Sequence, residues 1–522
     1  MNRWYQFATA LVALVALPAL APATATAAEI ARGIVFHDMN RNGARDPGEP
    51  GLRGIRVSNQ RDVVVTDSQG TYAIPVTDDC IVFVIKPSGW APPLTADRTF
   101  RFFRIHKPAG SPTSRFPGVA PTGPLPASID FPLVPQPEPR RFRVLLFGDT
   151  QPRNQQEVDY IAHDVVEGLI GADAAFGITL GDIVFDDLAV LDNLKRLKAL
   201  IGVPWIYVHG NHDTNQDAPD DRLSDETWER HFGPAYYAFD WGPVHFIVLD
   251  NIHWVGRTEA TPARYTGRLG ADQLAFVRND LARVPKSRLV VLLMHIPIEG
   301  VDDREELYRL IEDRPHTLSF SAHTHTQEHR LLGQAEGWRG RKPHHHLISA
   351  TVCGSWWSGA PDERGIPHAT MSDGAPNGHS VVTFDGSRYS IEFFPAGRPA
   401  TYQMNVYAPE EIAAADAPST EVLANVFAGS PRCKVEMRVG DRGAWLPMER
   451  VARPDPAYVE MKKLETGPKP PPGRALPGTS VCAHLWMARL PAGLEAGTHT
   501  VTVRTVDQFG RRHEARRVLR VR

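Results

Sequence analysis

The chain has 522 residues, which is too many for one hydrophobic core and predicts roughly two to four domains. Its 57 basic and 60 acidic residues nearly cancel, so the charge indicates neither a nucleic-acid duplex nor an anionic membrane as a partner. A hydrophobic fraction of 42% is ordinary for a globular protein and excludes disorder along the whole chain.

The first 28 residues have the pattern of a signal peptide. Arg3 supplies a positive charge, residues 8–20 form an apolar run, and small residues at 25–27 precede a predicted cleavage near Ala27 or Ala28. The run is too short for a membrane anchor, and no later run reaches the roughly 18 apolar residues of a transmembrane segment. We therefore expect a periplasmic or secreted protein without a transmembrane segment.

The rest of the chain predicts three domains. Residues 29–106 contain short β-rich runs between glycine and aspartate turns, which indicates an N-terminal β-sandwich. Residues 107–140 carry ten prolines, which favours an extended linker. Residues 141–379 alternate strand-like and helical patterns and predict an α/β domain that ends in a segment rich in glycine and tryptophan. Residues 380–522 return to short strands and predict a C-terminal β-sandwich.

Polar side chains follow five apolar strands of the α/β domain. Each has an ordinary explanation when taken alone, as a helix cap, a turn residue or part of an exposed edge strand. In α/β sheets, however, ligands bind at the carboxyl ends of strands, so five such ends should deliver their side chains to one place. Carboxylate, amide and imidazole groups together suit divalent metals such as Mn, Mg, Fe or Zn. The residues are Asp149, Gln151, Asp182, Asn211, His212, Asp213, His295, His323 and His325.

The order and spacing of these residues resemble the calcineurin-like metallophosphoesterase family, and the flanking β domains resemble those of a secreted bacterial subgroup. The motifs are Gly148-Asp149-x-Gln151, Gly181-Asp182-x-x-x-Asp186, Gly210-Asn211-His212-Asp213, Met294-His295 and Ala322-His323-Thr324-His325. The resemblance covers residues 141 to about 355. It implies an αββα sandwich, in which two mixed sheets pack face to face with helices outside.

The resemblance also implies a dinuclear centre and its ligands. Asp149, Gln151, Asp182 and His325 would hold one divalent ion, and Asp182, Asn211, His295 and His323 would hold the other. Asp182 would bridge, since two cations about 3.5–4 Å apart need an anion between them. The implied reaction is hydrolysis of phosphate monoesters or diesters by a metal-bridged hydroxide. His212 would lie near the leaving oxygen, with Asp213 as its orienting partner.

Two positions depart from related patterns. Gln151 stands where the family usually has histidine, and its amide oxygen is a weaker ligand than imidazole. Phe185 stands where purple acid phosphatases place a tyrosine ligand, and a phenyl ring cannot bind iron. The second departure disfavours a purple Fe(III) site.

The segment 353–379 is a candidate substrate loop. Trp356 or Trp357 would supply an apolar surface, and Asp373 or Asn377 would bind a hydroxyl group of a small phosphorylated substrate. Equally, the adjacent tryptophans could be core anchors in a turn. The nearby run of His344, His345 and His346 reads as a solvated turn.

The N-terminal domain contains a candidate calcium loop made of Asp38, Asn40, Asn42, Asp46 and Glu49. It follows a strand and resembles the calcium-bearing B-type repeats of bacterial adhesins. The alternative is a hairpin loop without an ion. Through its β domains the protein could associate with the cell envelope.

Export to an oxidising compartment allows disulfides, and we expect Cys433 to pair with Cys482, with Cys80 and Cys353 free. Two functions compete with a phosphoesterase. One is a surface- or glycan-binding protein with a vestigial metal domain, and the other is a protein phosphatase.

Overall fold

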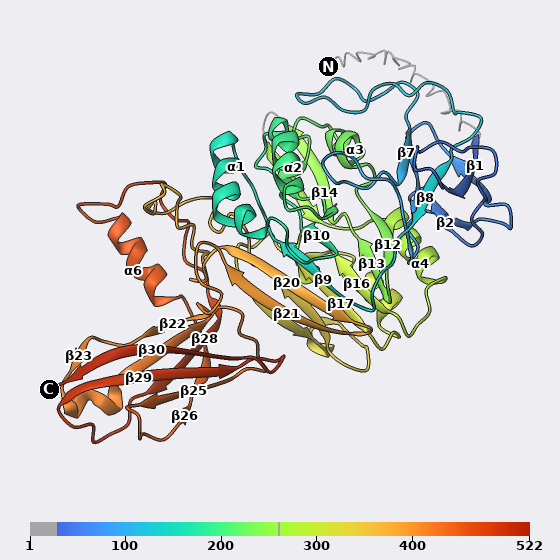
Figure 1. The fold of residues 1–522 in the computed structure, drawn as a ribbon. Helices are drawn as coiled ribbons and strands as arrows, with labels where there is room; N and C mark the ends of the chain where they lie inside the picture. The colour runs from blue at the N-terminus through green and yellow to red at the C-terminus, as the bar shows by residue number, and fades with distance from the viewer. Residues whose placement is uncertain (1–28, 259–260) are drawn as a thin grey trace, which may run out of the picture.

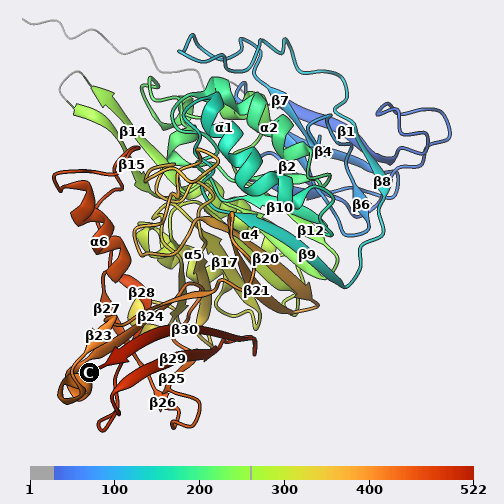
Figure 2. The same ribbon diagram turned by 60° about the vertical axis from the view of Figure 1, so that its left-hand side comes forward.

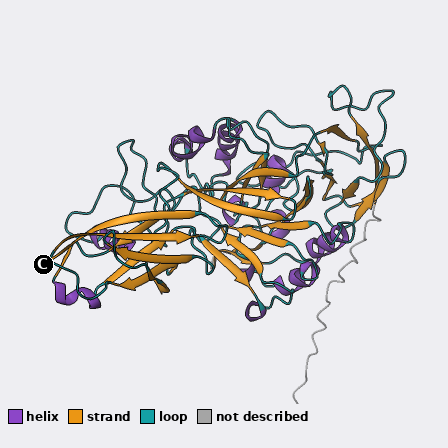
Figure 3. Cartoon of the chain, turned by 60° about the horizontal axis from the view of Figure 1, so that its bottom comes forward, coloured by secondary structure: helices purple, strands orange, loops and turns teal. Residues whose placement is uncertain are grey.

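The computed structural model describes residues 29–258 and 261–522, so the predicted signal peptide lies outside the described residues. Three parts lie in a row, with the N-terminal domain at one end and the C-terminal domain at the other (Figures 1 and 3). Among the described helices, none has the length and apolar character needed to cross a membrane.

The N-terminal domain is a sandwich of two four-stranded sheets, ordered β4-β1-β8-β6 and β3-β2-β5-β7. Every residue of β5 is buried, and the Phe83 ring lies 5.7 Å from that of Phe276 in the catalytic domain. The domain therefore packs firmly against its neighbour. The strands are β1 (Glu29–His37), β2 (Arg56–Ser58), β3 (Val63–Val65), β4 (Thr71–Val76), β5 (Cys80–Ile85), β6 (Trp90–Ala91), β7 (Phe103–His106) and β8 (Phe131–Pro135).

The prediction of an extended linker over residues 107–140 is wrong for residues 129–135, which are packed into the N-terminal domain, whereas residues 108–128 form no helix or strand and are mostly exposed or half-buried. Strand β8 of this segment pairs in parallel with β1, and the large apolar residues at every second position, Ile129, Phe131 and Leu133, are buried. This two-residue apolar period is hidden in the sequence by the prolines between and around it. Nearer its start, buried Lys107 binds Glu226 at 2.6 Å.

Two sheets facing each other form the centre of the catalytic domain, in the orders β11-β10-β9-β20-β21 and β12-β13-β16-β17-β19-β18. Phe176 of one sheet and Phe246 of the other touch edge to face, with ring centres 5.5 Å apart. Helices α1 and α2 pack on the first sheet, and α4 and α5 pack on the second. The predicted αββα sandwich is confirmed (Figure 1).

The strands of this domain are β9 (Arg141–Phe147), β10 (Phe176–Thr179), β11 (Trp205–Tyr207), β12 (Tyr237–Trp241), β13 (Val244–Val248), β14 (Ile252–Thr258), β15 (Thr261–Gly267), β16 (Leu289–Leu293), β17 (Thr317–Ser321), β18 (Glu328–Leu332), β19 (His344–Ile348), β20 (Gly378–Asp385) and β21 (Arg388–Pro395). Its helices are α1 (Gln155–Ile161), α2 (Leu191–Ala199), α3 (Glu226–Phe232), α4 (Ala271–Leu281) and α5 (Arg304–Ile311).

Strands β20 and β21 extend this domain beyond the predicted boundary at residue 379. β20 pairs antiparallel with β9, with Val382 opposite Val144. The catalytic sheet is thus completed by residues that the sequence pattern assigned to the C-terminal sandwich.

The histidine run 344–346 forms β19 and is buried, so the prediction of a solvated turn is wrong. Hydroxyl groups of β17 satisfy two of the three imidazoles: Ser319 Oγ lies 2.7 Å from His344 Nε2 and 2.7 Å from His346 Nδ1. His345 points the other way and lies 2.9 Å from His329 Nδ1 and 2.8 Å from the Tyr389 hydroxyl. Burial lowers the pKa of His344 to about 3, which keeps this imidazole neutral.

The C-terminal domain is a second sandwich, with sheets β22-β24-β28-β27 and β23-β30-β29-β25-β26. Helix α6 projects from it alongside the catalytic domain (Figure 2). The elements are β22 (Met404–Tyr407), β23 (Glu411–Ile412), β24 (Glu421–Val426), β25 (Lys434–Val439), β26 (Leu446–Pro447), β27 (Glu449–Arg453), α6 (Pro456–Glu465), β28 (Cys482–Arg489), β29 (Gly497–Val506) and β30 (Arg512–Val521).

The predicted disulfide between Cys433 and Cys482 is wrong. All four cysteines lie within the described residues, and all are free. Cys433 precedes β25 in one sheet, whereas Cys482 begins β28 in the other. Cys433 Sγ instead accepts a hydrogen bond from Ser430 N at 3.2 Å, and Cys482 Sγ lies beside His484.

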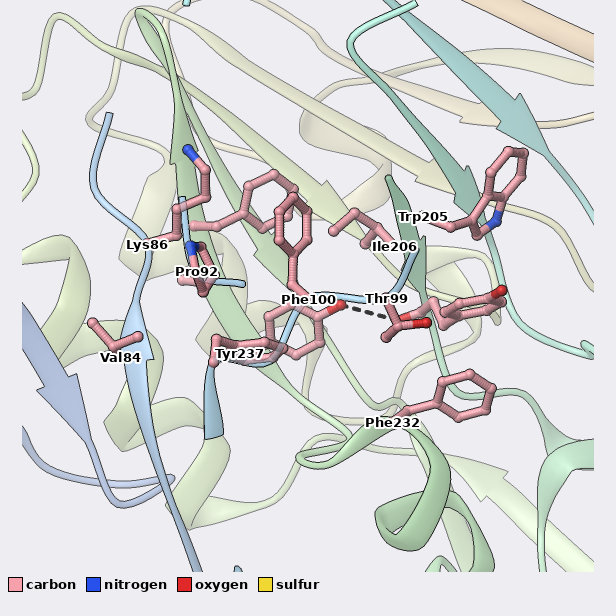
Figure 4. A pocket seen from close by; sticks show the side chains of 13 residues that line it. Val84, Lys86, Pro92, Thr99, Phe100, Trp205, Ile206, Phe232 and Tyr237 are labelled. Carbon is pink, nitrogen blue, oxygen red and sulfur yellow. Dashed lines mark hydrogen bonds between the residues drawn. The ribbon is translucent and has the colours of Figure 1, made fainter. Parts of the chain in front are cut away.

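The contact between the N-terminal and catalytic domains is mostly apolar (Figure 4). Val84, Pro92 and Phe100 meet Ile206 and Tyr237 around a cavity of about 20 Å³, which is room for about one water molecule. The dashed line in Figure 4 joins the Tyr237 hydroxyl to the Tyr207 carbonyl at 3.3 Å. This cavity is a gap in the domain interface rather than a substrate site.

A buried ionic network crosses the same interface. Arg56 of β2 donates to Asp240 at 2.7 Å and to Asp280 at 2.5 Å, and His245 lies 2.8 Å from an oxygen of each carboxylate. Both aspartates are at most 9% exposed at the side chain, so each depends on its partners in place of water.

Arg56→Ala should lower the free energy of unfolding by about 3–5 kcal/mol, because it leaves two buried carboxylates short of a partner. Urea denaturation measures the change. Arg61→Ala is the matched control, since its ion pair with Asp272 is 65% and 73% exposed, and we expect almost no effect. Equal stability of the two variants would contradict the role given to Arg56.

Candidate metal centre

The predicted ligands lie at the carboxyl ends of five strands from both sheets. Asp149 and Gln151 follow β9, Asp182 follows β10, and Asn211 follows β11. In the second sheet His295 follows β16, and His323 and His325 follow β17. Because β9, β10 and β11 are mutually parallel, as are β16 and β17, each set of ends opens at one edge. The prediction that these residues come together is consistent with the contacts between them.

Four donor atoms converge at the first half of the site. His295 Nε2 lies 3.2 Å from Asp182 Oδ2, 3.1 Å from Asn211 Oδ1 and 3.0 Å from His323 Nδ1. His295 Nδ1 lies 2.8 Å from the Leu180 carbonyl, which can only accept, so Nδ1 carries the proton and Nε2 offers a lone pair. Such a set of lone pairs needs a cation between them.

A proton can take the place of that cation. Burial opposes a charge on His295, but Asp182 outweighs burial and raises the pKa of His295 to about 9. Burial, reinforced by His295, lowers the pKa of His323 to about 4. A metal ion must displace the proton of His295, and Asp182, His295 and His323 are close enough together to hold one.

The second half of the site contains Asp149, Gln151 and His325. His325 Nδ1 lies 2.5 Å from the Gly354 carbonyl, which can only accept, so Nδ1 carries the proton. The lone pair of His325 Nε2 then faces Asp149 Oδ2, 3.1 Å away. That oxygen is buried and has no hydrogen-bond partner among the described residues. The Gln151 amide lies 2.8 Å from Asp182 Oδ2 and, on its other side, 3.5 Å from Cys353 Sγ. Rotating this amide by half a turn would direct its oxygen into the site. The donors here also fit a divalent ion.

Backbone strain is concentrated at this centre. Gln151, Asp182, His323 and His325 have φ values of +36°, +48°, +68° and +53°. Residues with side chains rarely adopt this left-handed region, and each costs on the order of 1–3 kcal/mol. The strands and cores around the loops therefore hold the ligands in conformations that the isolated loops would avoid.

His212 lies beside the ligands, and its orienting partner is Asp186. His212 Nδ1 is 2.6 Å from Asp186 Oδ1, and its ring stacks on Phe185 with centres 4.3 Å apart. The assignment of Asp213 to this role is wrong. Asp213 is buried and accepts from the backbone nitrogens of Ile183, Val184 and Gly210, so it positions the loops.

Of the predicted substrate-binding residues, only Trp356 lies against the metal centre. Its ring stacks on His325, with centres 4.0 Å apart. Trp357 is a core residue, 2% exposed, and donates to the Thr150 carbonyl. Asp373 is buried and binds Gln327 N and His484, and Asn377 is buried and binds Asp164. The assignment of these three to substrate is wrong because burial removes them from it.

Two residues beside the metal centre, Tyr265 and Arg153, carry no functional signal in the sequence. Tyr265 of the β14–β15 hairpin is 36% exposed and meets His323 edge to face, with centres 6.1 Å apart; partial burial, reinforced by Asp182, raises its pKa to about 12. Arg153 lies over the Phe185 ring, 4.2 Å from its centre. Neither belongs to a recognisable motif, although Arg153 stands two residues after Gln151.

The candidate calcium loop is compact. Asp38 accepts from the backbone nitrogens of Asn42 and Gly43, and Glu49 accepts from those of Met39 and Asp46. Asp46 also accepts from the Asn40 and Asn42 amides. Since these contacts would also stabilise a loop without an ion, calcium binding stays a prediction.

Comparison with known proteins identifies all three parts of the chain. Residues 142–327 match the sequence model of the calcineurin-like phosphoesterases, and residues 39–117 and 346–513 match those of the N- and C-terminal domains of these enzymes. No curated protein matches the chain. Among solved structures, a purple acid phosphatase from yellow lupin (Lupinus luteus) seeds aligns at 14% identity, 66% coverage of this chain, 79% coverage of that chain and a TM-score of 0.36, too low to support any inference. The family matches and the converging donors show that the chain belongs to the calcineurin-like phosphoesterase family and is a metal-dependent phosphoric ester hydrolase.

Proposed function

We propose that the protein is an exported phosphoesterase that hydrolyses phosphate monoesters or diesters at a dinuclear centre. One divalent ion, Mn, Fe, Zn or Mg, would be held by Asp149, Gln151, Asp182 and His325. The other would be held by Asp182, Asn211, His295 and His323. The β domains at either end would place the enzyme at the cell envelope.

The position of Asp182 carries this proposal. Its Oδ2 lies 3.2 Å from His295 Nε2 in one ligand set and 2.8 Å from the Gln151 amide in the other. A carboxylate between two sets of donors can neutralise part of the charge of two neighbouring cations. A single-ion site would not need this shared anion.

When bound, two divalent ions would activate water as the nucleophile and stabilise negative charge on the phosphoryl oxygens. The chain itself would supply the group at the leaving oxygen. His212 is half-buried, is anchored through Nδ1 by Asp186, and packs on Phe185, so its Nε2 is the atom available to a substrate. Asp186 would favour the protonated imidazole, which can donate a hydrogen bond or a proton.

Asp182→Asn should abolish hydrolysis of 4-nitrophenyl phosphate, because a neutral amide cannot bridge two cations. Elemental analysis at saturating Mn should show two ions per wild-type chain and at most one per variant. Asp159→Asn, at an exposed position on α1, is the control and should match wild type in both measurements. Wild-type protein with only one ion would contradict the dinuclear assignment.

Gln151→His should retain or tighten the first metal site, since imidazole is a stronger donor than an amide oxygen. Titration with a metal chelator measures the affinity, and Gln151→Ala should weaken it. Complete loss of that metal in Gln151→His would show that Gln151 is not a ligand.

His212→Ala should slow hydrolysis of an alkyl phosphate by about 10²–10⁴-fold, and that of 4-nitrophenyl phosphate far less, because nitrophenolate leaves without a proton. Asp186→Asn should show the same difference more weakly. Steady-state rates with both esters test this, alongside metal analysis. An equal loss on both esters would mean that His212 stabilises the phosphoryl oxygens instead.

A further inference from the structure

Two arginines from different domains meet at the edge of the metal centre. Arg153 Nη1 donates to the Trp356 carbonyl at 2.9 Å, and Arg474 Nη1 donates to the same oxygen at 3.0 Å. The Trp356 ring stacks on the metal ligand His325. On its other side Arg153 covers Phe185, which stacks on His212. Arg153 is thus one side chain away from both His212 and His325.

Arg474 comes from the C-terminal domain, in the segment between α6 and β28. Helix α6 holds this segment, since Glu465 accepts from Leu476 N at 2.8 Å and Lys462 donates to the Leu476 carbonyl at 2.6 Å. The Arg474 carbonyl accepts from Gly359 N at 2.7 Å, in the loop that carries Trp356. The position of Arg474 beside the metal centre is therefore fixed by backbone contacts.

The pair carries excess positive charge. Glu157 is the carboxylate that binds both arginines, at 3.4 Å from Arg153 Nη1 and 3.3 Å from Arg474 Nη2. One carboxylate balances only one of the two charges. Three guanidinium nitrogens make no hydrogen bond to any described residue: Nη2 and Nε of Arg153, and Nε of Arg474. The Arg474 side chain is 48% exposed, so its remaining donors can reach a bound molecule.

Guanidinium groups bind phosphoryl oxygens with paired, charge-assisted hydrogen bonds. An unbalanced arginine pair beside a centre that binds one phosphoryl group suits a substrate with a second phosphoryl group. The Trp356 ring stacks on His325 and the Phe185 ring stacks on His212, so both rings border the metal centre and would line the path of the substrate.

We propose, on the basis of the function proposed above, that Arg153 and Arg474 bind a second phosphoryl group, so that the substrates are organic diphosphates and similar esters with two phosphoryl groups. The C-terminal domain would thereby contribute a residue to substrate recognition. The metal centre would bind the phosphoryl group that is cleaved, and the arginine pair would bind its neighbour.

Calorimetric titration of the Mn-loaded full-length protein tests this with two probes, methylphosphonate and methylenediphosphonate, which differ by one phosphonate group and are not hydrolysed. Arg474→Gln should weaken the binding of methylenediphosphonate by about tenfold or more and that of methylphosphonate much less, because the substitution removes charge-assisted hydrogen bonds to the second phosphonate group only. Arg474→Lys should recover part of the affinity. Arg516→Gln, an exposed residue on β30 of the same domain, is the matched control and should bind both probes like wild type.

If Arg474→Gln left both affinities unchanged, the proposal would be overturned. An equal loss for both probes would also overturn it, since Arg474 would then only hold Trp356 in place. The titration requires no turnover, so its outcome is separate from the test of hydrolysis. A wild-type protein inactive on every ester would defeat the proposed function, and the affinity ratio would still show whether the pair binds a second phosphoryl group.

Discussion

The carboxylate of Asp182 sets the main constraint on the catalytic domain, because the loops after β9, β10, β11 and β16 must all approach it. Two glycines make this approach possible. A Cβ atom on Gly210 would lie 2.0 Å from the Asp182 backbone nitrogen, and one on Gly181 would lie 2.4 Å from His295 Nδ1. Both distances are far shorter than any normal contact. The strand ends are thus held closer together than side chains would allow, with Asp182 itself in a left-handed conformation.

The metal ligands could be predicted from the sequence because each depends on a local rule, a polar residue directly after a buried strand. The chain order and the glycines beside them made the combination specific. The residue assignments that failed depend on burial, which short motifs do not encode. Asp213, Trp357, Asp373 and Asn377 are polar or aromatic residues near the site, yet their side chains point into the protein. Asp186 was part of a recognised motif, but only the turn geometry shows that it faces His212.

Prediction of the fold was limited in the same way, because local sequence patterns do not show which distant residues pack together. The catalytic sandwich could be predicted because strands and helices alternate over long, regular runs. β8 was missed because prolines mask a two-residue period. β19 was missed because its three histidines look solvated until their buried partners, the hydroxyls of β17 together with His329 and Tyr389, are placed beside them. The assignment of β20 and β21 failed because pairing partners far apart in sequence leave no local signal.

The loop that carries Trp356 is bounded at both ends by the two sheets. It leaves after β19 and returns into β20, and Cys353 N donates to the Asp149 carbonyl at 3.0 Å while Gly378 N donates to the Thr351 carbonyl at 3.1 Å. Its ends are therefore only a few ångströms apart and are fixed by backbone groups, whatever the side chains between them. Closing a longer or shorter loop between fixed ends changes the free energy of folding only slowly with length. Related enzymes could therefore acquire new substrates by insertion or deletion at the mostly exposed residues 361–365 of this segment, without altering the sheets that hold the metals.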